Sequence, residues 1–299
     1  MTVREGIFPA QENRDPRKGL LLMLVGIGLF SILNGVVKAQ MEVFPPNQVI
    51  FFRNAFALIP LWFMLVPLGG LVALRSTRIK EHVMLSVLFT GTLLCIFYAY
   101  SIMPLVDVTA ITFMQPLLVS VFAFALGLEK TTRLQWLAVV IGLGGVLIMV
   151  QPTGGGPVIG GLIALAGSAM GAASMLIQRR LSGTDSTQSI AFYTLGVSAL
   201  LMLPLMFYSY VSPTPWQLAG LIGMGIASGL CQYVIVRAFY HATASEIAPM
   251  TYTKIIWAVV IGYLWFAEVP TLEVMIGSLA VMGATYLAFR SAAAARMTI

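Results

Sequence analysis

The sequence predicts an all-α integral membrane protein whose ten transmembrane helices form two inverted five-helix repeats. Three observations support this fold class. Hydrophobic residues make up 59% of the 299 residues and charged residues only 9%, with a mean hydropathy of +0.93, far from the values of soluble domains. Apolar stretches of about twenty residues, the length that crosses a hydrocarbon core, follow one another along the chain. The two halves also resemble each other at a constant offset.

Short polar or proline- and glycine-rich segments separate the apolar stretches. Two divisions depend on such segments alone, because residues 134–178 and 186–236 contain no charged residue. Residues 151–157 (Gln-Pro-Thr-Gly-Gly-Gly-Pro) interrupt the first, and residues 212–215 (Ser-Pro-Thr-Pro) interrupt the second. We therefore expect helices near residues 19–38, 47–68, 82–103, 105–127, 133–150, 158–180, 188–209, 215–240, 246–267 and 271–290.

The chain divides into a polar tail (1–18), a first repeat (19–150), a second repeat (158–290) and a short tail (291–299). No small-residue cleavage site follows the first apolar stretch, so we expect it to be a retained helix. With ten spans, Lys38 is alone on the side opposite the termini, and Arg53 and Lys254 fall within helices. The other basic residues share the side of the termini, which the positive-inside rule assigns to the cytoplasm. They are Arg4, Arg14, Arg17, Lys18, Arg75, Arg78, Lys80, Lys130, Arg133, Arg179, Arg180, Arg237, Arg290 and Arg296.

The repeat is clearest around the fourth and ninth expected helices. An offset of 139 residues pairs Asp107 with Glu246, Phe113 with Tyr252, Gln115 with Lys254, and Glu129 with Glu268. Five helices per repeat is an odd number, so the second copy enters the membrane from the opposite side. Inverted repeats of this kind predict alternating access around a site near the membrane midplane.

Lys254 is the only charged residue in the apolar stretch 247–267. A lone ammonium at membrane depth is costly and marks a functional site, because it must face a bundle interior or a wet cavity. The alternative is that its four-carbon stem extends along the helix and brings the charge to the membrane surface. We expect the first arrangement, and a substrate carboxylate as the partner of Lys254.

The other candidate substrate residues are polar or aromatic side chains at mid-membrane positions. Gln115 and Tyr252 are expected to hydrogen-bond the head group of an amino acid, and Trp257, Phe113, Met114 and Tyr98 to contact an apolar or aromatic side chain. Buried amides and hydroxyls need hydrogen-bond partners, so for each further candidate the alternative is a structural hydrogen bond to a neighbouring helix. These are Asn34, Ser174, Gln178 and Gln232.

The remaining charges bear on energy coupling. Every acidic residue lies at an expected helix end or in a loop, and His82 and His241 lie near the membrane surface. Proton-driven transport usually needs a titratable group within the membrane. We therefore expect transport without proton coupling. For Arg53 we expect a structural role, pairing with Glu42 or capping carbonyls at a loop.

This pattern resembles the drug/metabolite transporter superfamily and, within it, the EamA-type family of bacterial permeases. The resemblance covers residues 19 to 290 and depends on the two fivefold repeats, with fourth helices that end in Glu129 and Glu268. It implies an inner-membrane exporter of amino acids and related metabolites, and the pattern is similar to that of bacterial exporters of aromatic amino acids. The family often has proline in each fourth helix. Pro116 matches it, but position 255 is isoleucine, which leaves the kink of the ninth helix in doubt.

Several other functions have less support. No cofactor or metal site is predicted, since Cys95 and Cys231 lie inside apolar helices. An enzyme would need a nucleophile–base pair or a metal cluster, and the basic loops follow from topology and not from nucleic-acid binding. The rival transport classes are a proton-coupled metabolite or drug exporter and a phosphate or nucleotide-sugar antiporter. A receptor or structural protein also remains open, as does the oligomeric state, for which a monomer suffices.

Overall fold

A computed structural model describes residues 15–66, 70, 74, 76–128, 133–150, 156–241 and 248–296, so Glu129 lies outside the described residues. In this part of the chain all regular structure is helical. Seven helices are long and apolar enough to cross a membrane, and three shorter apolar helices cover Arg133–Met149, Met250–Phe266 and Leu272–Ala288. The prediction of ten membrane helices is confirmed.

The first repeat begins with a well-capped helix. The Asp15 carboxylate accepts the backbone N–H groups of Arg17 and Lys18, which would otherwise be unpaired at the start of α1. Proline at the first position of α2 likewise removes a donor that has no intrahelical acceptor. The helices are α1 (Pro16–Met41), α2 (Pro46–Leu65), α3 (Ile79–Ile102), α4 (Leu105–Thr112) with α5 (Met114–Ala125), and α6 (Arg133–Val150).

The second repeat follows the same plan. The Ser186 hydroxyl accepts the backbone N–H of Ser189 at the start of the second helix, and Pro215 begins the third. The elements are α7 (Gly156–Leu181), α8 (Thr187–Tyr208), α9 (Pro215–His241), the 3-10 helix η4 (Ala248–Tyr252) with α11 (Thr253–Phe266), and α12 (Leu272–Arg296).

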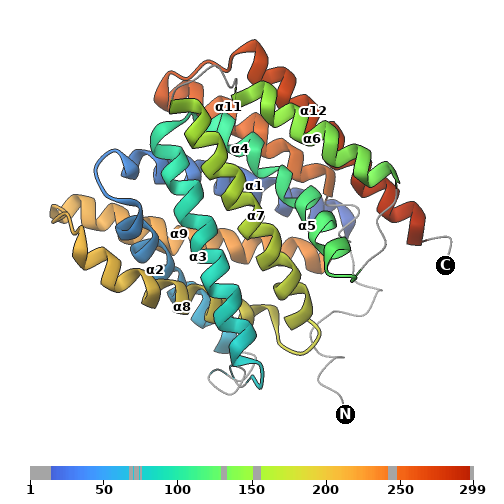
Figure 1. The fold of residues 1–299 in the computed structure, drawn as a ribbon. Coiled ribbons are helices and arrows are strands. Elements are labelled where there is room, and N and C mark those ends of the chain that lie inside the picture. Colours follow the sequence, from blue (N-terminus) through green and yellow to red (C-terminus); the bar gives the residue numbers. More distant parts are fainter. Residues whose placement is uncertain are drawn as a thin grey trace.

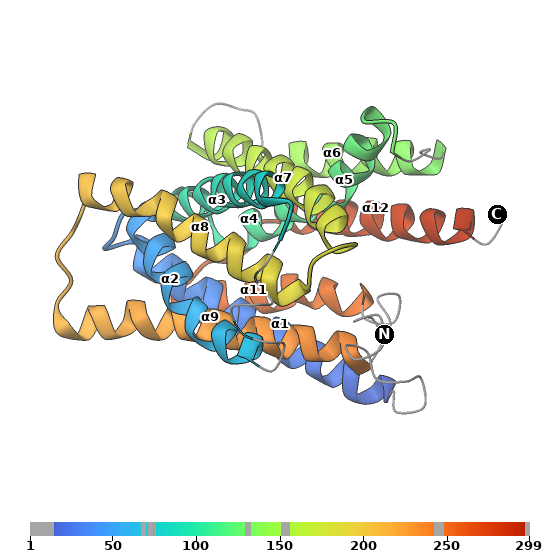
Figure 2. The same cartoon turned by 90° about the horizontal axis from the view of Figure 1, so that it is seen from below.

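The contacts between helices show the same symmetry as the two repeats (Figure 1 and Figure 2). The counterparts α2 and α8 pack against each other, as do α6 and α12. Other contacts form related pairs: α3 packs against α7 as α9 packs against α1, and α2 packs against α9 as α8 packs against α3. Exchanging the halves maps contacts onto contacts, as inverted repeats require.

The fifth helices of the two repeats come closest at a pair of glycines. A Cβ on Gly145 of α6 would stand 2.8 Å from the carbonyl oxygen of Gly277 on α12. Small residues allow backbones to approach this closely in membranes, where tight packing replaces the hydrophobic effect between helices.

The first residues of α1 and the last residues of α12 lie at the same end of the bundle (Figure 1 and Figure 2). This agrees with an even number of crossings. We call it the terminal end, and we call the other the distal end, which holds the α1–α2, α3–α4 and α11–α12 connections. That the terminal end faces the cytoplasm stays a prediction from the basic residues.

Candidate functional site

The fourth and ninth helices are both interrupted at positions that the repeat relates. α4 gives way to α5 at Phe113, and η4 gives way to α11 at Tyr252. Pro116 explains the first interruption, because its missing N–H leaves the carbonyl of Thr112 without an intrahelical donor. In the ninth helix Ile255 takes that position, yet the helix still changes its winding after η4, which contains Pro249. The ninth helix is therefore irregular at this place, although it lacks the proline of the family pattern.

The rings of Phe113 and Tyr252 stack across the two interruptions, with centroids 5.9 Å apart and planes 22° apart. The two residues are each other's counterparts in the repeat, so this contact lies on the pseudo-twofold axis. Phe113 is also close to the middle of the apolar span Leu105–Ala125. The stack therefore marks the centre of the bundle, both across the membrane and between the repeats.

Lys254 follows Tyr252 by two residues and lies in the first turn of α11. Its side chain is half-buried. No described residue forms a hydrogen bond or ion pair with its ammonium group. Its backbone lies at mid-depth, because Tyr252 stacks on the middle of the fourth helix. Lys254 is thus a cation near the bundle centre for which the described chain supplies no counter-ion.

Gln115 occupies the equivalent place beside the stack on the other repeat. It lies directly over Gly171 of α7, where a Cβ would stand 2.9 Å from its amide nitrogen. Its amide forms no hydrogen bond with any described residue. The structure therefore brings four predicted residues to the centre: Phe113, Tyr252, Lys254 and Gln115.

The other predicted residues are more scattered. Met114 is fully buried and lies over Gly142 of α6, which makes it a core residue instead of a cavity residue. The Ser174 hydroxyl donates to the Gly171 carbonyl (2.8 Å), so its own helix satisfies it. Trp257 packs over Gly28 of α1 and is 37% exposed. Gln178 and Tyr98 are exposed, whereas Asn34 and Gln232 are half-buried.

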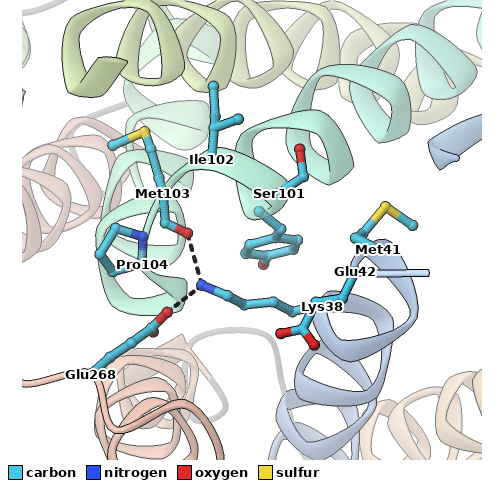
Figure 3. A pocket seen from close by; sticks show the side chains of 9 residues that line it. Lys38, Met41, Glu42, Ser101, Ile102, Met103, Pro104 and Glu268 are labelled. Carbon is cyan, nitrogen blue, oxygen red and sulfur yellow. Dashed lines mark hydrogen bonds and ion pairs between the residues drawn. The ribbon is translucent and has the colours of Figure 1, made fainter. Parts of the chain in front are cut away.

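A second polar site, at the distal end, was not among the predicted site residues. Lys38, near the end of α1, forms an ion pair with Glu268 and donates a hydrogen bond to the Met103 carbonyl (2.8 Å) (Figure 3). The other oxygen of Glu268 accepts the backbone N–H of Leu105 (2.8 Å) at the start of α4. We call Lys38, Glu268, Met103 and Leu105 the distal cluster. It joins α1, the α3–α4 turn and the end of α11.

The distal cluster adjoins a cavity of about 330 Å³ (Figure 3), within the range of small-molecule sites. Its lining consists of Lys38, Met41, Glu42, Tyr100, Ser101, Ile102, Met103, Pro104 and Glu268. Asp107, in the first turn of α4, lies within electrostatic range of both Glu268 and Lys38. One sequence signal pointed here: Lys38 is the single basic residue assigned to the distal side, where topology does not account for it.

Arg53 corrects a further expectation. Its side chain does not pair with Glu42 or cap a loop in the described structure. It is only 7% exposed and donates a hydrogen bond to the Asn54 side chain (3.1 Å). Its guanidinium lies 6.0 Å from the ring centroid of Phe30 on α1 and 5.9 Å from that of Phe97 on α3. Arg53 therefore points into the bundle.

The terminal end has its own hydrogen-bonded pair of polar side chains. His82, at the start of α3, is fully buried, and its Nε2 lies 2.6 Å from the carboxylate of Asp185 in the α7–α8 connection. Partial burial raises the pKa of Asp185, but hydrogen bonds from Ser76 and His82 outweigh it, so the pKa is lowered overall. This pair ties α3 to the second repeat.

Comparison with known proteins supports the fold and its division into repeats. A family model described as the EamA-like transporter family matches residues 17–151 and, separately, residues 158–290. A solved crystal structure with 18% sequence identity superposes with a TM-score of 0.64, over 92% of this chain and 98% of that one.

Three similar proteins carry names. The pseudopaline exporter of Pseudomonas aeruginosa is 29% identical over 85% of this chain and 89% of its own length. The S-adenosylmethionine uptake transporter of Rickettsia prowazekii is 26% identical over 89% of each chain. The riboflavin transporter of Vibrio cholerae is 26% identical over 89% of this chain and 91% of its own. All three names describe transporters of small molecules.

Proposed function

Because the chain belongs to the EamA-like transporter family, we propose that it exports amino acids, chiefly aromatic and other neutral apolar ones, and related metabolites across the bacterial inner membrane. The substrate binds at the bundle centre, where the repeats meet at Phe113 and Tyr252. Alternating access follows from the inverted repeats: the two halves exchange conformations and expose this centre to one side of the membrane and then to the other.

The observation that carries this proposal is that no described residue pairs with the ammonium group of Lys254. A buried cation without a partner is strongly unfavourable, and a carboxylate on the substrate removes that penalty each time it binds. Gln115, the counterpart of Lys254 in the other repeat, and Tyr252, two residues before Lys254, supply hydrogen bonds to the head group. The adjacent stack of Phe113 and Tyr252 offers ring faces to a flat or apolar side chain.

The names of two related transporters each match one feature of this site. S-adenosylmethionine contains an amino-acid group, and riboflavin contains a flat aromatic ring system; those molecules are cargo of the related proteins. A site with one cation beside aromatic rings suits molecules that combine a carboxylate with a flat group. The same features in this chain support an amino acid or an amino-acid derivative as its cargo.

Counterflow in liposomes that contain the purified full-length protein tests this function. We expect exchange of labelled phenylalanine, and we expect Lys254→Met to reduce its rate at least about tenfold, the effect of losing one charge-assisted interaction. Lys80→Met is the matched control, because Lys80 is exposed at the terminal end. Wild-type exchange by Lys254→Met would remove Lys254 from the site. If the wild-type protein exchanged none of a panel of amino acids and metabolites, a receptor or structural role would replace transport.

A proton-coupled exporter is the second candidate, and one observation favours it. A second carboxylate, Asp107, lies within electrostatic range of the Lys38–Glu268 ion pair, and neighbouring carboxylates form proton relays in many transporters. Our proposal is uncoupled transport, since both carboxylates lie at helix ends. Accumulation of phenylalanine above equilibrium under an imposed pH gradient would establish coupling instead.

A further inference from the structure

Arg53 is a second cation inside the bundle, and it is buried. Among the described residues, none places a negative charge beside it. The groups around its guanidinium are Asn54, the rings of Phe30 and Phe97, Tyr100, and the Cys231 thiol. Asn54 is also engaged elsewhere, since its amide nitrogen donates to Ser198 of α8 (2.9 Å). No described carboxylate forms an ion pair with Arg53.

The hydrogen-bonding capacity of Arg53 is largely unused. A guanidinium has five N–H donors in a planar fork that fits a carboxylate, and it keeps its charge in proteins. Of these donors, one forms a hydrogen bond with a described residue, Asn54. The rings of Phe30 and Phe97 stabilise the charge through cation–π contacts, which do not replace the hydrogen bonds of the remaining donors.

The arc of α1 beside Arg53 carries further unused polar groups. Gly28 and Gly35 face α11 and Gly26 faces α9, so Phe30, Ser31 and Asn34 lie on the interior arc between those contacts. The Ser31 hydroxyl is buried without a partner in the described structure. Polar groups left unpaired in a membrane interior indicate a place where a ligand or water completes their hydrogen bonds.

The two buried cations lie on either side of α1, on α2 and α11. Gly28 of α1 contacts Trp257 of α11, so these two residues lie at the same level. At a rise of 1.5 Å per residue, Phe30 lies about 3 Å beyond Gly28 along α1, toward the distal end. Lys254 lies about 4.5 Å before Trp257 along α11, toward the terminal end. Arg53 is therefore displaced toward the distal end relative to Lys254 by roughly two helical turns or less. Tyr100 connects this level to the distal cavity, because it lines that cavity and lies within electrostatic range of Arg53.

We propose that Arg53 is a second anion-binding position and that the transported molecule is an amino-acid derivative with at least two carboxylates, one bound at Lys254 and the other at Arg53. This inference rests on the proposed function and shifts its preferred cargo from neutral amino acids to the related metabolites that carry two carboxylates. Two cations for which the described residues supply no counter-ion suit a simple neutral amino acid poorly, because such a molecule brings one carboxylate and adds an ammonium group.

The test compares two matched probes, phenylalanine and 4-carboxyphenylalanine, which differ by one carboxylate on the ring. Binding of each to the purified full-length protein is measured by competition in detergent. We expect the wild type to bind 4-carboxyphenylalanine about tenfold more tightly. Arg53→Met should abolish this preference, and Arg53→Lys should retain part of it, because lysine keeps the charge without the fork. Lys254→Met should weaken both probes.

Equal affinity of the wild type for the two probes, or an unchanged preference in Arg53→Met, would overturn the proposal. Failure of both probes to bind would count against the proposed function. In that case thermal stability decides the role of Arg53. A site built for an absent anion predicts that Arg53→Met unfolds at the wild-type temperature or above it, whereas a loss of several degrees would make Arg53 structural and end the proposal.

Discussion

Lys38 and Lys254 lie in the same bundle, yet their surroundings differ completely. Lys38 has a carboxylate, a carbonyl and the ring of Phe266, 5.2 Å from its ammonium group. Lys254 has no hydrogen-bond or ion-pair partner among the described residues. A charge within a membrane protein requires compensation. Where the described residues supply it, as at the distal cluster, the lysine connects helices. At Lys254 they supply none, and we propose that a ligand does.

The comparison predicts opposite effects of the same substitution on stability. Lys38→Met leaves the carboxylate of Glu268 buried and unpaired, which costs roughly 3 kcal/mol when one partner of a buried pair is removed. Lys254→Met replaces an uncompensated charge by an apolar side chain of similar length, so we expect unchanged or increased stability. Thermal unfolding of the two purified variants in detergent measures the difference.

The double variant Lys38→Met/Glu268→Gln is the control for this experiment. It removes both charges of the distal cluster and should recover most of the stability that Lys38→Met loses. Equal losses of stability in Lys38→Met and Lys254→Met would end the distinction between the two lysines, and would indicate that Lys254 has a structural partner of its own.

Much of the fold could be predicted from the sequence, because its signals are local or periodic. Apolar stretches locate the helices, and the 139-residue offset pairs Phe113 with Tyr252, which the structure places in contact. Side-chain direction was harder to predict. Lipid is as apolar as a protein core, so hydropathy does not show which face of a membrane helix points inward, and the direction of the Arg53 side chain was wrongly predicted for this reason.

The distal cluster shows a second limit of sequence reasoning. Lys38 and Glu268 were assigned to the same side of the membrane, but 230 residues separate them. Their contact depends on how the ends of α1 and α11 meet the α3–α4 turn. Nothing local in the sequence encodes that meeting, whereas the helix interruption at Pro116 depends on a single residue type.

Substitutions in the stack of Phe113 and Tyr252 test the region around Lys254 without changing a charge. Phe113→Ala and Tyr252→Ala should each slow counterflow of phenylalanine about three- to tenfold, the effect of losing an aromatic contact, and should slow leucine less. The matched control is Phe124→Ala, which breaks the peripheral contact between Phe124 and Trp136 (5.5 Å). Equal slowing of phenylalanine and leucine would assign the stack to packing and not to substrate recognition.

The smallest expected effect concerns the His82–Asp185 pair at the terminal end, where the chain again supplies the partner of a polar side chain. Asp185 has a lowered pKa in the folded protein, so folding favours its ionised form. Its contribution is therefore fully present above the ordinary aspartate pKa of about 3.9 and is lost as the pH falls through the lower folded value. At pH 7 we expect Asp185→Asn to unfold at a lower temperature than the wild type, because it loses roughly 1 kcal/mol or less of unfolding free energy. The difference in unfolding temperature between the two proteins should narrow below about pH 4. A gap that stays constant down to pH 3 would show that the carboxylate's charge does not contribute, and that packing of the α7–α8 connection on His82 is what joins the repeats there.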